Sequence, residues 1–257
     1  MQLLAKELLS RRLSQLLTSR KKLSSTPGLA LIWVGEDIQT ATYIRAKQVV
    51  AKKLNCQFFL HHFPSANQKQ LESVIDGLNG RKDIDGIVLQ LPLPKTVDTE
   101  TLIGKVSLTK DTDNLSGDSP YASPTPSSII ALLNFYKIDL KKCQTVVLGA
   151  GRLVGGPLAH VFAKNNWPLT IISKKAKSQA EIIHKHDLLI SATGVKHLVT
   201  PAMVHKDMVV VDGSGVDVDL KEIEPLVAKI TPSQGAIGPL TVSFLFENLL
   251  KVASQKP

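Results

Sequence analysis

The chain has 257 residues, 43% of them hydrophobic and 21% charged, and it carries a formal net charge of +9. This composition is typical of a globular protein with one large or two small domains, and no apolar run approaches the roughly 18 residues that a transmembrane helix needs. The basic charge does not favour nucleic-acid binding, because the lysines and arginines form only short clusters and the aromatic residues, 5% of the chain, are not interleaved with them. We expect a solvated basic surface that attracts small polyanions.

The N-terminal residues 1–17 have apolar positions at helical spacing, interrupted by charged side chains, and predict an amphipathic helix of the mature protein rather than a signal peptide. The cysteines, Cys56 and Cys143, lie far apart in apolar surroundings, which favours buried thiols in a reducing compartment. We therefore expect a cytoplasmic protein. The histidines have no matching carboxylate or cysteine spacing, so we expect no metal site.

Strand and helix patterns alternate along the first part of the chain. The predicted elements are a strand over 28–35, a helix to about residue 54, a strand over 56–63, a helix over 68–79 and a buried strand over 84–94. Pro92 and Pro94 must terminate the last of these strands. This order indicates parallel strands whose two faces are covered by helices.

A segment rich in Asp, Ser, Pro and Gly, residues 111–128, predicts a loop and a domain junction. A helix over 128–137 follows it, and then a second series of buried strands over 144–151, 169–173, 187–194 and 208–215 outlines a nucleotide-binding sheet. The fold class is therefore α/β with two domains. We predict an N-terminal catalytic domain over 1–118, joined by the C-terminal helix at 241–257, and a Rossmann-like domain with a parallel sheet over 119–240.

Glycines follow the first strand of the second series, at Gly149, Gly151 and Gly155. A strand, a glycine turn and a helix form the context of a dinucleotide-binding fingerprint, although the G-x-G-x-x-x-G spacing also fits an ordinary strand-to-helix turn. After the next strand come Ser173, Lys174 and Lys175, without an acid that would bind the ribose hydroxyls of NAD. This favours NADP over NAD, unless the lysines are merely solvated.

Tyr43 and Lys47 are four residues apart, so they share one face of the helix predicted there. Such pairs are common on helix surfaces. Short-chain dehydrogenases use a Tyr-x-x-x-Lys pair, but they place it after the cofactor turn, whereas this pair precedes the glycines by about a hundred residues. That interpretation fails on chain order.

A different resemblance covers nearly the whole chain. The segments "ATYIRAK", "DGIVLQLPLP", "KDTDN", "SPTPSSIIALL", the glycine turn and "TPSQGAIGPLT" occur in the order and spacing of the bifunctional methylenetetrahydrofolate dehydrogenase/methenyltetrahydrofolate cyclohydrolase family. The resemblance implies NADP-dependent oxidation of 5,10-methylenetetrahydrofolate and hydrolysis of the methenyl product to 10-formyltetrahydrofolate. It also implies tetrahydrofolate one-carbon derivatives as ligands and a homodimer joined through the cofactor domains.

The same resemblance implies roles for individual residues. Tyr43 corresponds to a tyrosine that packs on the folate ring, Lys47 to the central catalytic lysine, Gln90 to the glutamine that tunes it and Asp113 to an aspartate that binds the pterin. The implied substrate-binding residues also include Leu89, Leu91, Gly235, Ile237, Gly238 and Pro239. The implied cofactor-binding residues are Gly149, Ala150, Gly151, Arg152, Leu153, Ser173, Lys174, Lys175, Ser191, Ala192, Thr193, Gly194 and Gly215, although those that follow strands are equally ordinary as packing or turn residues.

The chemistry explains why a lysine suits this position. A buried lysine that is hydrogen-bonded by a neutral amide has a lowered pKa and can move protons near neutral pH. A protonated lysine beside the positively charged methenyl substrate would be unfavourable. The neutral amine of Lys47 is therefore the useful form.

Several motifs depart from the family pattern. In the glycine turn Ala150 replaces an arginine and Gly151 a serine, and Lys174 stands where a phosphate-binding serine is expected. In the substrate loops Asn114 and Ala236 replace glycines, which alone are free at most positive φ values. A divergent active enzyme, a cyclohydrolase without dehydrogenase activity and a non-catalytic folate- or nucleotide-binding paralogue all remain open.

Overall fold

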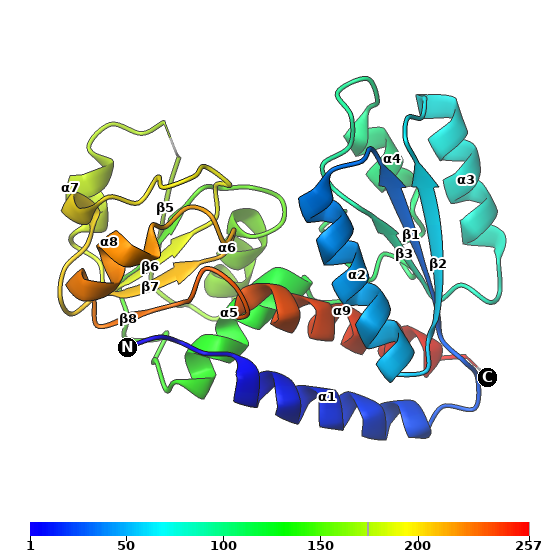
Figure 1. The fold of residues 1–257 in the computed structure, drawn as a ribbon, viewed down its shortest axis with the longest axis horizontal. Coiled ribbons are helices and arrows are strands. Elements are labelled where there is room, and N and C mark those ends of the chain that lie inside the picture. The colour runs from blue at the N-terminus through cyan, green and yellow to red at the C-terminus, as the bar shows by residue number, and fades with distance from the viewer. Residues whose placement is uncertain (174, 257) are drawn as a thin grey trace. The chain divides into compact units, whose positions relative to one another are not determined.

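The computed structural model describes residues 1–173 and 175–256, and over these residues the chain forms two compact units (Figure 1). The three-stranded unit comprises Arg11–Pro124 and Val242–Pro257, and the five-stranded unit comprises Met1–Ser10 and Thr125–Thr241. The predicted two-domain α/β fold with parallel sheets is confirmed. The domain bounds 1–118 with 241–257, and 119–240, remain predictions.

The sheet of the three-stranded unit has the strand order β2-β1-β3 within the described residues, and both outer strands are parallel to β1. Its elements are β1 (Gly28–Val34), α2 (Ile38–Lys53), β2 (Gln57–Phe63), α3 (Gln68–Gly80), β3 (Gly86–Leu89), α4 (Thr99–Lys105) and the greater parts of α1 (Lys6–Lys21) and α9 (Ile237–Ala253). A helix follows each strand, as parallel pairing requires.

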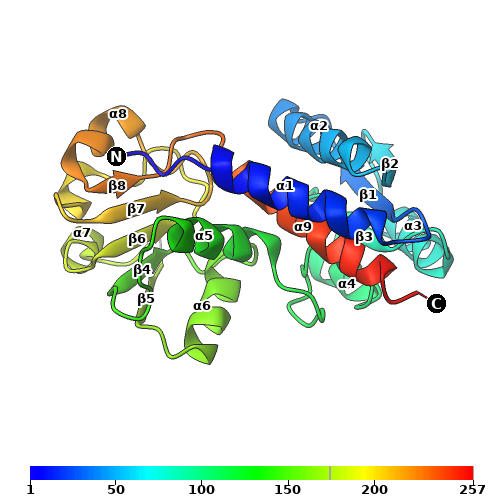
Figure 2. The ribbon, with the colours of Figure 1, turned by 90° about the horizontal axis from the view of Figure 1, so that it is seen from below.

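Helices cover both faces of this sheet, so β1 is buried along its whole length. Ala30 and Ile32 pack with apolar residues of α3 and α4 on one face. Leu29 and Leu31 pack on the other face with α2, α1 and α9. In Figure 2, α1 and α9 lie side by side where Arg12 of α1 donates to Glu247 of α9 at 2.6 Å. Burial on both faces explains the continuous apolar run of this strand.

The sheet of the five-stranded unit has the order β5-β4-β6-β7-β8 in the described part of the chain, and all its neighbouring strands are parallel. Its elements are α5 (Pro124–Phe135), β4 (Thr145–Leu148), α6 (Gly155–Lys164), β5 (Leu169–Ile172), α7 (Gln179–Ile183), β6 (Leu188–Ser191), η1 (Pro201–Met203), β7 (Val209–Asp212), α8 (Leu220–Ile223), η2 (Glu224–Leu226) and β8 (Lys229–Ile230). The strands predicted for the second series occur as β4 to β7, whereas β8 is too short for its pattern to be recognised.

Two apolar clusters enclose this second sheet. Val147 and Ile190 pack with Leu132 of α5 and Phe162 of α6 on one face. On the other face, apolar residues of β4, β6 and β7 pack with α7, η1 and α8. The central strands β4, β6 and β7 are therefore buried on both faces.

The N-terminal helix begins at Lys6, which corrects the prediction that it starts with the first residues. The residues before it extend the edge of the five-stranded sheet: Leu3 N donates to Ile230 O at 2.7 Å, and Ile230 N donates to Met1 O at 3.0 Å. Leu3 is fully buried. Met1–Ser10 thus belong to the five-stranded unit, whereas the sequence analysis assigned them to the first domain. No helix of the described residues is long and apolar enough to cross a membrane.

Candidate active site and cofactor site

Lys47 lies on α2, one turn after Tyr43. The helix is started by Asp37, whose side chain accepts from Thr40 N at 2.7 Å. Lys47 is 3% exposed, and its Nζ donates to Gln90 Oε1 at 2.9 Å. Nζ also lies 4.7 Å from the centre of the Tyr43 ring. The predicted pair therefore shares one face with its functional atoms gathered at the same place.

Gln90 follows β3 directly and is held by its backbone and its side chain. Its N–H donates to Ile32 O at 2.9 Å, and its Nε2 donates to Leu91 O at 3.0 Å. This leaves Oε1 aimed at Lys47. Leu89 is buried at the end of β3 and Leu91 is half-buried. The carboxyl end of the strand thus positions a neutral acceptor for the buried Nζ of Lys47.

Burial lowers the pKa of the Lys47 ammonium, and the carboxylate of Asp113 opposes this shift. Burial also raises the pKa of Asp113; Lys47 opposes that shift and Asp111 reinforces it. The structure therefore brings three of the predicted polar residues, Lys47, Gln90 and Asp113, into one electrostatic environment. An amine with a lowered pKa is available to accept a proton.

The altered substrate loops are compatible with their new residues. Asn114 has φ +49°, a left-handed conformation that asparagine tolerates, and its Nδ2 donates to Ser123 Oγ at 3.1 Å. Ala236 is not among the residues with positive φ in the described chain, and it is buried, so this position does not require glycine. Gly235, at φ +82°, supplies the left-handed residue of that loop.

The remaining predicted substrate residues belong to the five-stranded unit. Gly235 precedes α9, and Ile237, Gly238 and Pro239 form its first residues. Their contribution to substrate binding remains a prediction.

The glycine turn after β4 has the geometry of a dinucleotide-binding turn despite its spacing. Gly149 has φ +100°, and a Cβ on Gly155 would lie 1.9 Å from Gly149 O. Glycine at 155 thus permits the first turn of α6 to approach the glycine turn closely, the packing role of the last glycine in the fingerprint. Val154, at the N-cap of α6, makes no side-chain capping hydrogen bond, although Gly156 N donates to Gly151 O at 3.0 Å. The glycine turn that leads into the N-terminus of α6 fits a pyrophosphate.

The other predicted cofactor residues surround this turn or follow the neighbouring strands. Ala150, Gly151 and Leu153 are exposed, and Arg152 is half-buried. Ser173 and Lys175 are exposed after β5, and Lys174 lies outside the described residues. Ser191 ends β6 and is buried; Ala192 and Thr193 are half-buried, Gly194 is exposed, and Gly215 follows β7.

The sequence analysis missed Asp217, which is fully buried and accepts from Ser191, Thr193 and Ser214. Its one local sign is an acid between two valines in "GVDVD".

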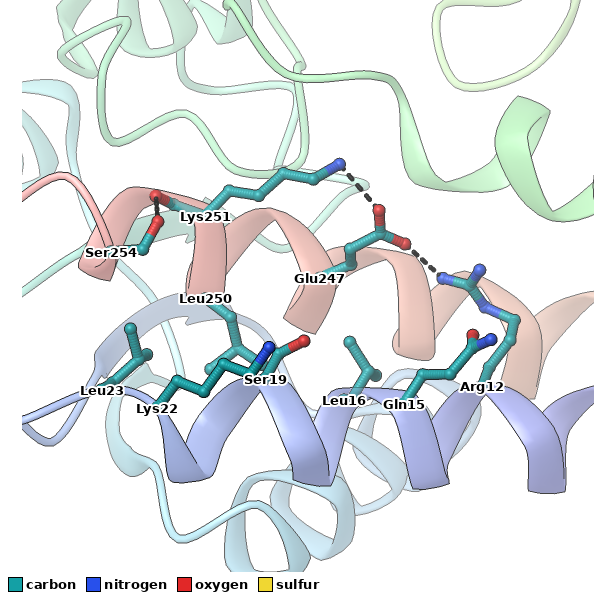
Figure 3. Close-up of a pocket in the computed structure, with 10 residues that line it drawn as sticks. All are labelled: Arg12, Gln15, Leu16, Ser19, Lys22, Leu23, Glu247, Leu250, Lys251 and Ser254. Carbon is teal, nitrogen blue, oxygen red and sulfur yellow. Dashed lines mark hydrogen bonds and ion pairs between the residues drawn. The ribbon is translucent and has the colours of Figure 1, made fainter.

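A groove with a volume of 590 Å³ lies between α1 and α9 of the three-stranded unit (Figure 3). Glu247 accepts from Arg12 at 2.6 Å and from Lys251 at 2.7 Å, and Leu16 and Leu250 lie below them. Two cations of this groove, Arg12 and Lys251, are therefore paired with Glu247, and we interpret the groove as packing surface.

The fold and the two sites define an α/β protein with a dinucleotide-binding unit and a separate unit that holds a buried lysine. A family model described as the tetrahydrofolate dehydrogenase/cyclohydrolase catalytic domain matches residues 2–113, and one described as the NAD(P)-binding domain of the same family matches residues 123–257. The chain belongs to the tetrahydrofolate dehydrogenase/cyclohydrolase family.

Individual relatives agree with this membership. The chain is 35% identical to the bifunctional protein FolD of Lactobacillus helveticus over 97% of its own length and 95% of that protein. The solved bifunctional enzyme FolD of Campylobacter jejuni has a TM-score of 0.89 at 27% identity and covers 99% of this chain and 98% of its own. The dehydrogenase-cyclohydrolase of Trypanosoma brucei, solved with NADP and an inhibitor, has a TM-score of 0.88 at 25% identity, covering 98% of this chain and 95% of its own.

Proposed function

We propose that this chain oxidises 5,10-methylenetetrahydrofolate to 5,10-methenyltetrahydrofolate with NADP and hydrolyses the product to 10-formyltetrahydrofolate. The observation that carries this proposal is the buried amine of Lys47, hydrogen-bonded to the neutral amide of Gln90 at 2.9 Å. The names of the relatives, which describe bifunctional enzymes of this chemistry, support it as well. In this proposal the domain predicted over 1–118, apart from Met1–Ser10, binds folate together with 241–257, and the domain predicted over 119–240 binds NADP.

Lys47 has the properties that the hydrolysis requires. Its lowered pKa supplies a neutral amine, which can accept a proton from water at Nζ as the water attacks the methenyl carbon. The protonated amine can then return the proton to N5 as the bond between N5 and that carbon breaks and the hydroxyl proton leaves to solvent, which gives the 10-formyl product. Gln90 keeps Nζ in place, and Asp113 supplies a carboxyl group for the pterin ring. Such general acid/base work contributes on the order of 10²–10⁴-fold in rate.

The five-stranded unit would hold NADP through its glycine turn and the N-terminus of α6, with Ser173 and Lys175 near the 2′-phosphate. When bound, NADP supplies the hydride acceptor for the oxidation. The basic residues after β5 favour NADP over NAD, because no acid there competes with a phosphate.

The cyclohydrolase-only and non-catalytic alternatives draw on the altered glycine turn, where Ala150 replaces an arginine that normally helps to hold NADP. The positive φ of Gly149 and the close approach of Gly155 argue against the cyclohydrolase-only alternative, because the turn keeps the shape that a pyrophosphate needs. A nucleotide-binding protein without turnover would keep the same turn, so the assay of activity distinguishes it.

A coupled absorbance assay tests the proposal. Purified protein is given 5,10-methylenetetrahydrofolate with NADP⁺ or NAD⁺, and reduced cofactor and methenyl product are followed separately, with Lys47→Met as the control for contaminating activity. We expect turnover with NADP⁺ that Lys47→Met abolishes. The absence of reduced cofactor with either dinucleotide would refute the dehydrogenase, and methenyl substrate added directly would then separate a cyclohydrolase from a binding protein.

We also propose that the enzyme is a cytoplasmic homodimer joined through its cofactor domains. The family resemblance supports the dimer, and the half-buried free thiols of Cys56 and Cys143 are compatible with a reducing compartment. Sedimentation velocity at micromolar concentration should give twice the monomer mass, and a monomer at these concentrations would contradict the dimer.

A further inference from the structure

Asp217 joins the carboxyl ends of two neighbouring strands of the five-stranded sheet. Its Oδ2 accepts from Ser191 Oγ at 2.5 Å, from Thr193 N at 2.8 Å and from Thr193 Oγ1 at 2.8 Å. Its Oδ1 accepts from Ser214 Oγ at 2.6 Å. Ser191 and Thr193 belong to the end of β6 and the loop after it, whereas Ser214 belongs to the loop after β7. One fully buried carboxylate therefore ties both loops together.

Asp212 holds the second of these loops from the other side. Its Oδ1 accepts from Ser214 N at 3.0 Å and from Gly215 N at 2.7 Å, and it lies 2.9 Å from Ser214 Oγ, whose single hydrogen it shares with Asp217 Oδ1. Burial raises the pKa of Asp212, while the bonds from Ser214, Gly215 and Val218 oppose this shift and Asp217 reinforces it. The Ser214 hydroxyl thus lies between the carboxyl groups of Asp212 and Asp217. It connects the hydrogen bonds that Asp217 makes to the loop after β6 with those that Asp212 makes within the loop after β7.

The braced loop touches the glycine turn. A Cβ on Gly149 would lie 2.9 Å from Ala192 O and 3.0 Å from Thr193 Cγ2. The two segments are therefore in direct contact, with Asp217 behind Thr193. In open parallel sheets a ligand binds outside the carboxyl ends of the strands, where the strand order changes direction. In the order β5-β4-β6-β7-β8 this point lies between β4 and β6, where the glycine turn meets the loop that Asp217 holds.

We propose that Asp217 is a positioning residue for the dinucleotide: it fixes the loops after β6 and β7 in the conformation that receives the cofactor. This inference rests on the proposed function of the five-stranded unit as the NADP-binding domain. Removing the carboxylate would leave the donors of Ser191 and Thr193 without their buried acceptor, and such donors seek other partners by moving the loop. Asp217 is then required for cofactor affinity without contacting the reacting atoms.

The test is a comparison of Asp217→Asn with Asp187→Asn. Asp187 is a matched control in the same unit, because its Oδ2 accepts from a backbone group, Gln144 N, at 2.8 Å, but at the amino end of β6. For Asp217→Asn we expect the Kd for NADP⁺, measured by direct titration, and the KM for NADP⁺ to rise about tenfold or more, whereas kcat at saturating NADP⁺ changes less than threefold. Hydrolysis of added methenyltetrahydrofolate, which needs no dinucleotide, should stay within twofold. Asp187→Asn should leave the Kd for NADP⁺ within twofold.

An unchanged Kd in Asp217→Asn would overturn the inference, and so would an equal fall of the cyclohydrolase rate, which would indicate general damage to the fold. If Asp217→Asn does not fold, Ser214→Ala replaces it, because Ser214 is exposed and its loss leaves the bonds from Ser191 and Thr193 to Asp217 in place. The substitution removes the Oδ1 partner of Asp217, together with the contact to Asp212 Oδ1 and the acceptor of Val216 N. We then expect a rise of about threefold in the Kd for NADP⁺, and an unchanged Kd would again overturn the inference. The titration needs no turnover, so a protein that binds NADP⁺ but does not react would fail the proposed function while still testing the role of Asp217.

Discussion

Lys47 and Asp217 are both buried ionisable residues, each in its own unit, and both are surrounded mainly by neutral hydrogen-bonding groups. Lys47 donates to the amide of Gln90, and burial lowers its pKa. Asp217 accepts from the hydroxyls of Ser191, Thr193 and Ser214 and from a backbone N–H. Lys47 has one neutral hydrogen-bond partner and a lowered pKa, so its amine can act as a base. Asp217 accepts hydrogen bonds from three residues, so it can hold two loops together. The number of neutral hydrogen-bonding groups around each side chain therefore distinguishes the two roles.

Asp85 provides a third arrangement, in which a cation offsets a buried carboxylate. Its side chain is 1% exposed, its Oδ2 accepts from Gly28 N at 2.8 Å, and its Oδ1 pairs with Lys256 Nζ. Here the tail of the chain supplies the counter-charge. The three sites predict different responses to substitution.

The largest effect is expected for Lys47→Arg, which keeps the positive charge but cannot lose its proton at any pH at which the protein is folded. If the neutral amine is the catalytic form, this variant loses the cyclohydrolase rate by about 10²–10⁴-fold. The hydrolysis of methenyltetrahydrofolate measures the loss, with NADP⁺ binding as the control for an intact five-stranded unit. A variant that keeps more than a tenth of the rate would contradict the base role.

The pH dependence of the cyclohydrolase rate in the unmodified protein also tests whether neutral Lys47 is the catalytic base. The fraction of neutral Lys47 increases as pH rises through its folded-state pKa, which burial places below the ordinary lysine value. The cyclohydrolase rate, corrected for the uncatalysed reaction, should therefore rise with pH over that range and then level. A rate that falls across the same range would indicate that the protonated amine is the active form.

A smaller effect is expected for Gln90→Leu, which removes the neutral acceptor but keeps a side chain of similar size. Lys47 Nζ then loses its 2.9 Å partner and its fixed position. We expect the cyclohydrolase rate to fall by roughly 10- to 100-fold, since misplacement of a catalytic group costs up to about 10²-fold. Gln90→Glu is the matched variant: it keeps the acceptor but adds a charge, which should raise the pKa of Lys47 and move the pH profile to higher pH.

Local sequence patterns were sufficient to predict the two-domain fold and the parallel strands, because apolar runs define the strands. A four-residue spacing placed Tyr43 and Lys47 on one helix face, whereas Gln90 and Asp113 were predicted only from the family resemblance. The position of Met1–Ser10 was beyond such reasoning, because the pairing of Leu3 with Ile230 joins residues more than two hundred positions apart.

Asp217 was overlooked for a related reason. Its partners at 191, 193 and 214 are brought together only when β6 and β7 pair, and no local pattern signals this. The doubts about Asn114 and Ala236 also needed backbone angles to resolve, since only the structure gives the φ at each position.

Lys256→Met tests the pair of Lys256 with Asp85 through its effect on the free energy of unfolding. Without the ammonium, Asp85 Oδ1 is left buried without a counter-charge, which costs about 1–3 kcal/mol for an unsatisfied group. Because Lys256 is 37% exposed, we expect the lower end of that range, near 1 kcal/mol. Urea unfolding measures the change, and the double variant Asp85→Asn with Lys256→Met should recover part of it. An additive double variant would indicate that the two side chains do not interact.

The smallest effect is expected for Ser191→Ala, which removes one hydroxyl donor from Asp217 and leaves the bonds from Thr193 and Ser214 in place. A carboxylate that keeps its other donors loses little, so the Kd for NADP⁺ should rise only about two- to threefold, which is near the lower end of the roughly 0.5–1.5 kcal/mol typical of a single hydrogen bond. Direct titration measures it, with the cyclohydrolase rate as control. The contrast with Gln90→Leu is informative because each substitution removes one neutral partner of a buried ionisable group. If Ser191→Ala weakened NADP⁺ binding as much as Asp217→Asn does, the position of the Asp217 carboxylate would depend on a single donor. Asp217 would then resemble Lys47, whose Nζ has one neutral partner.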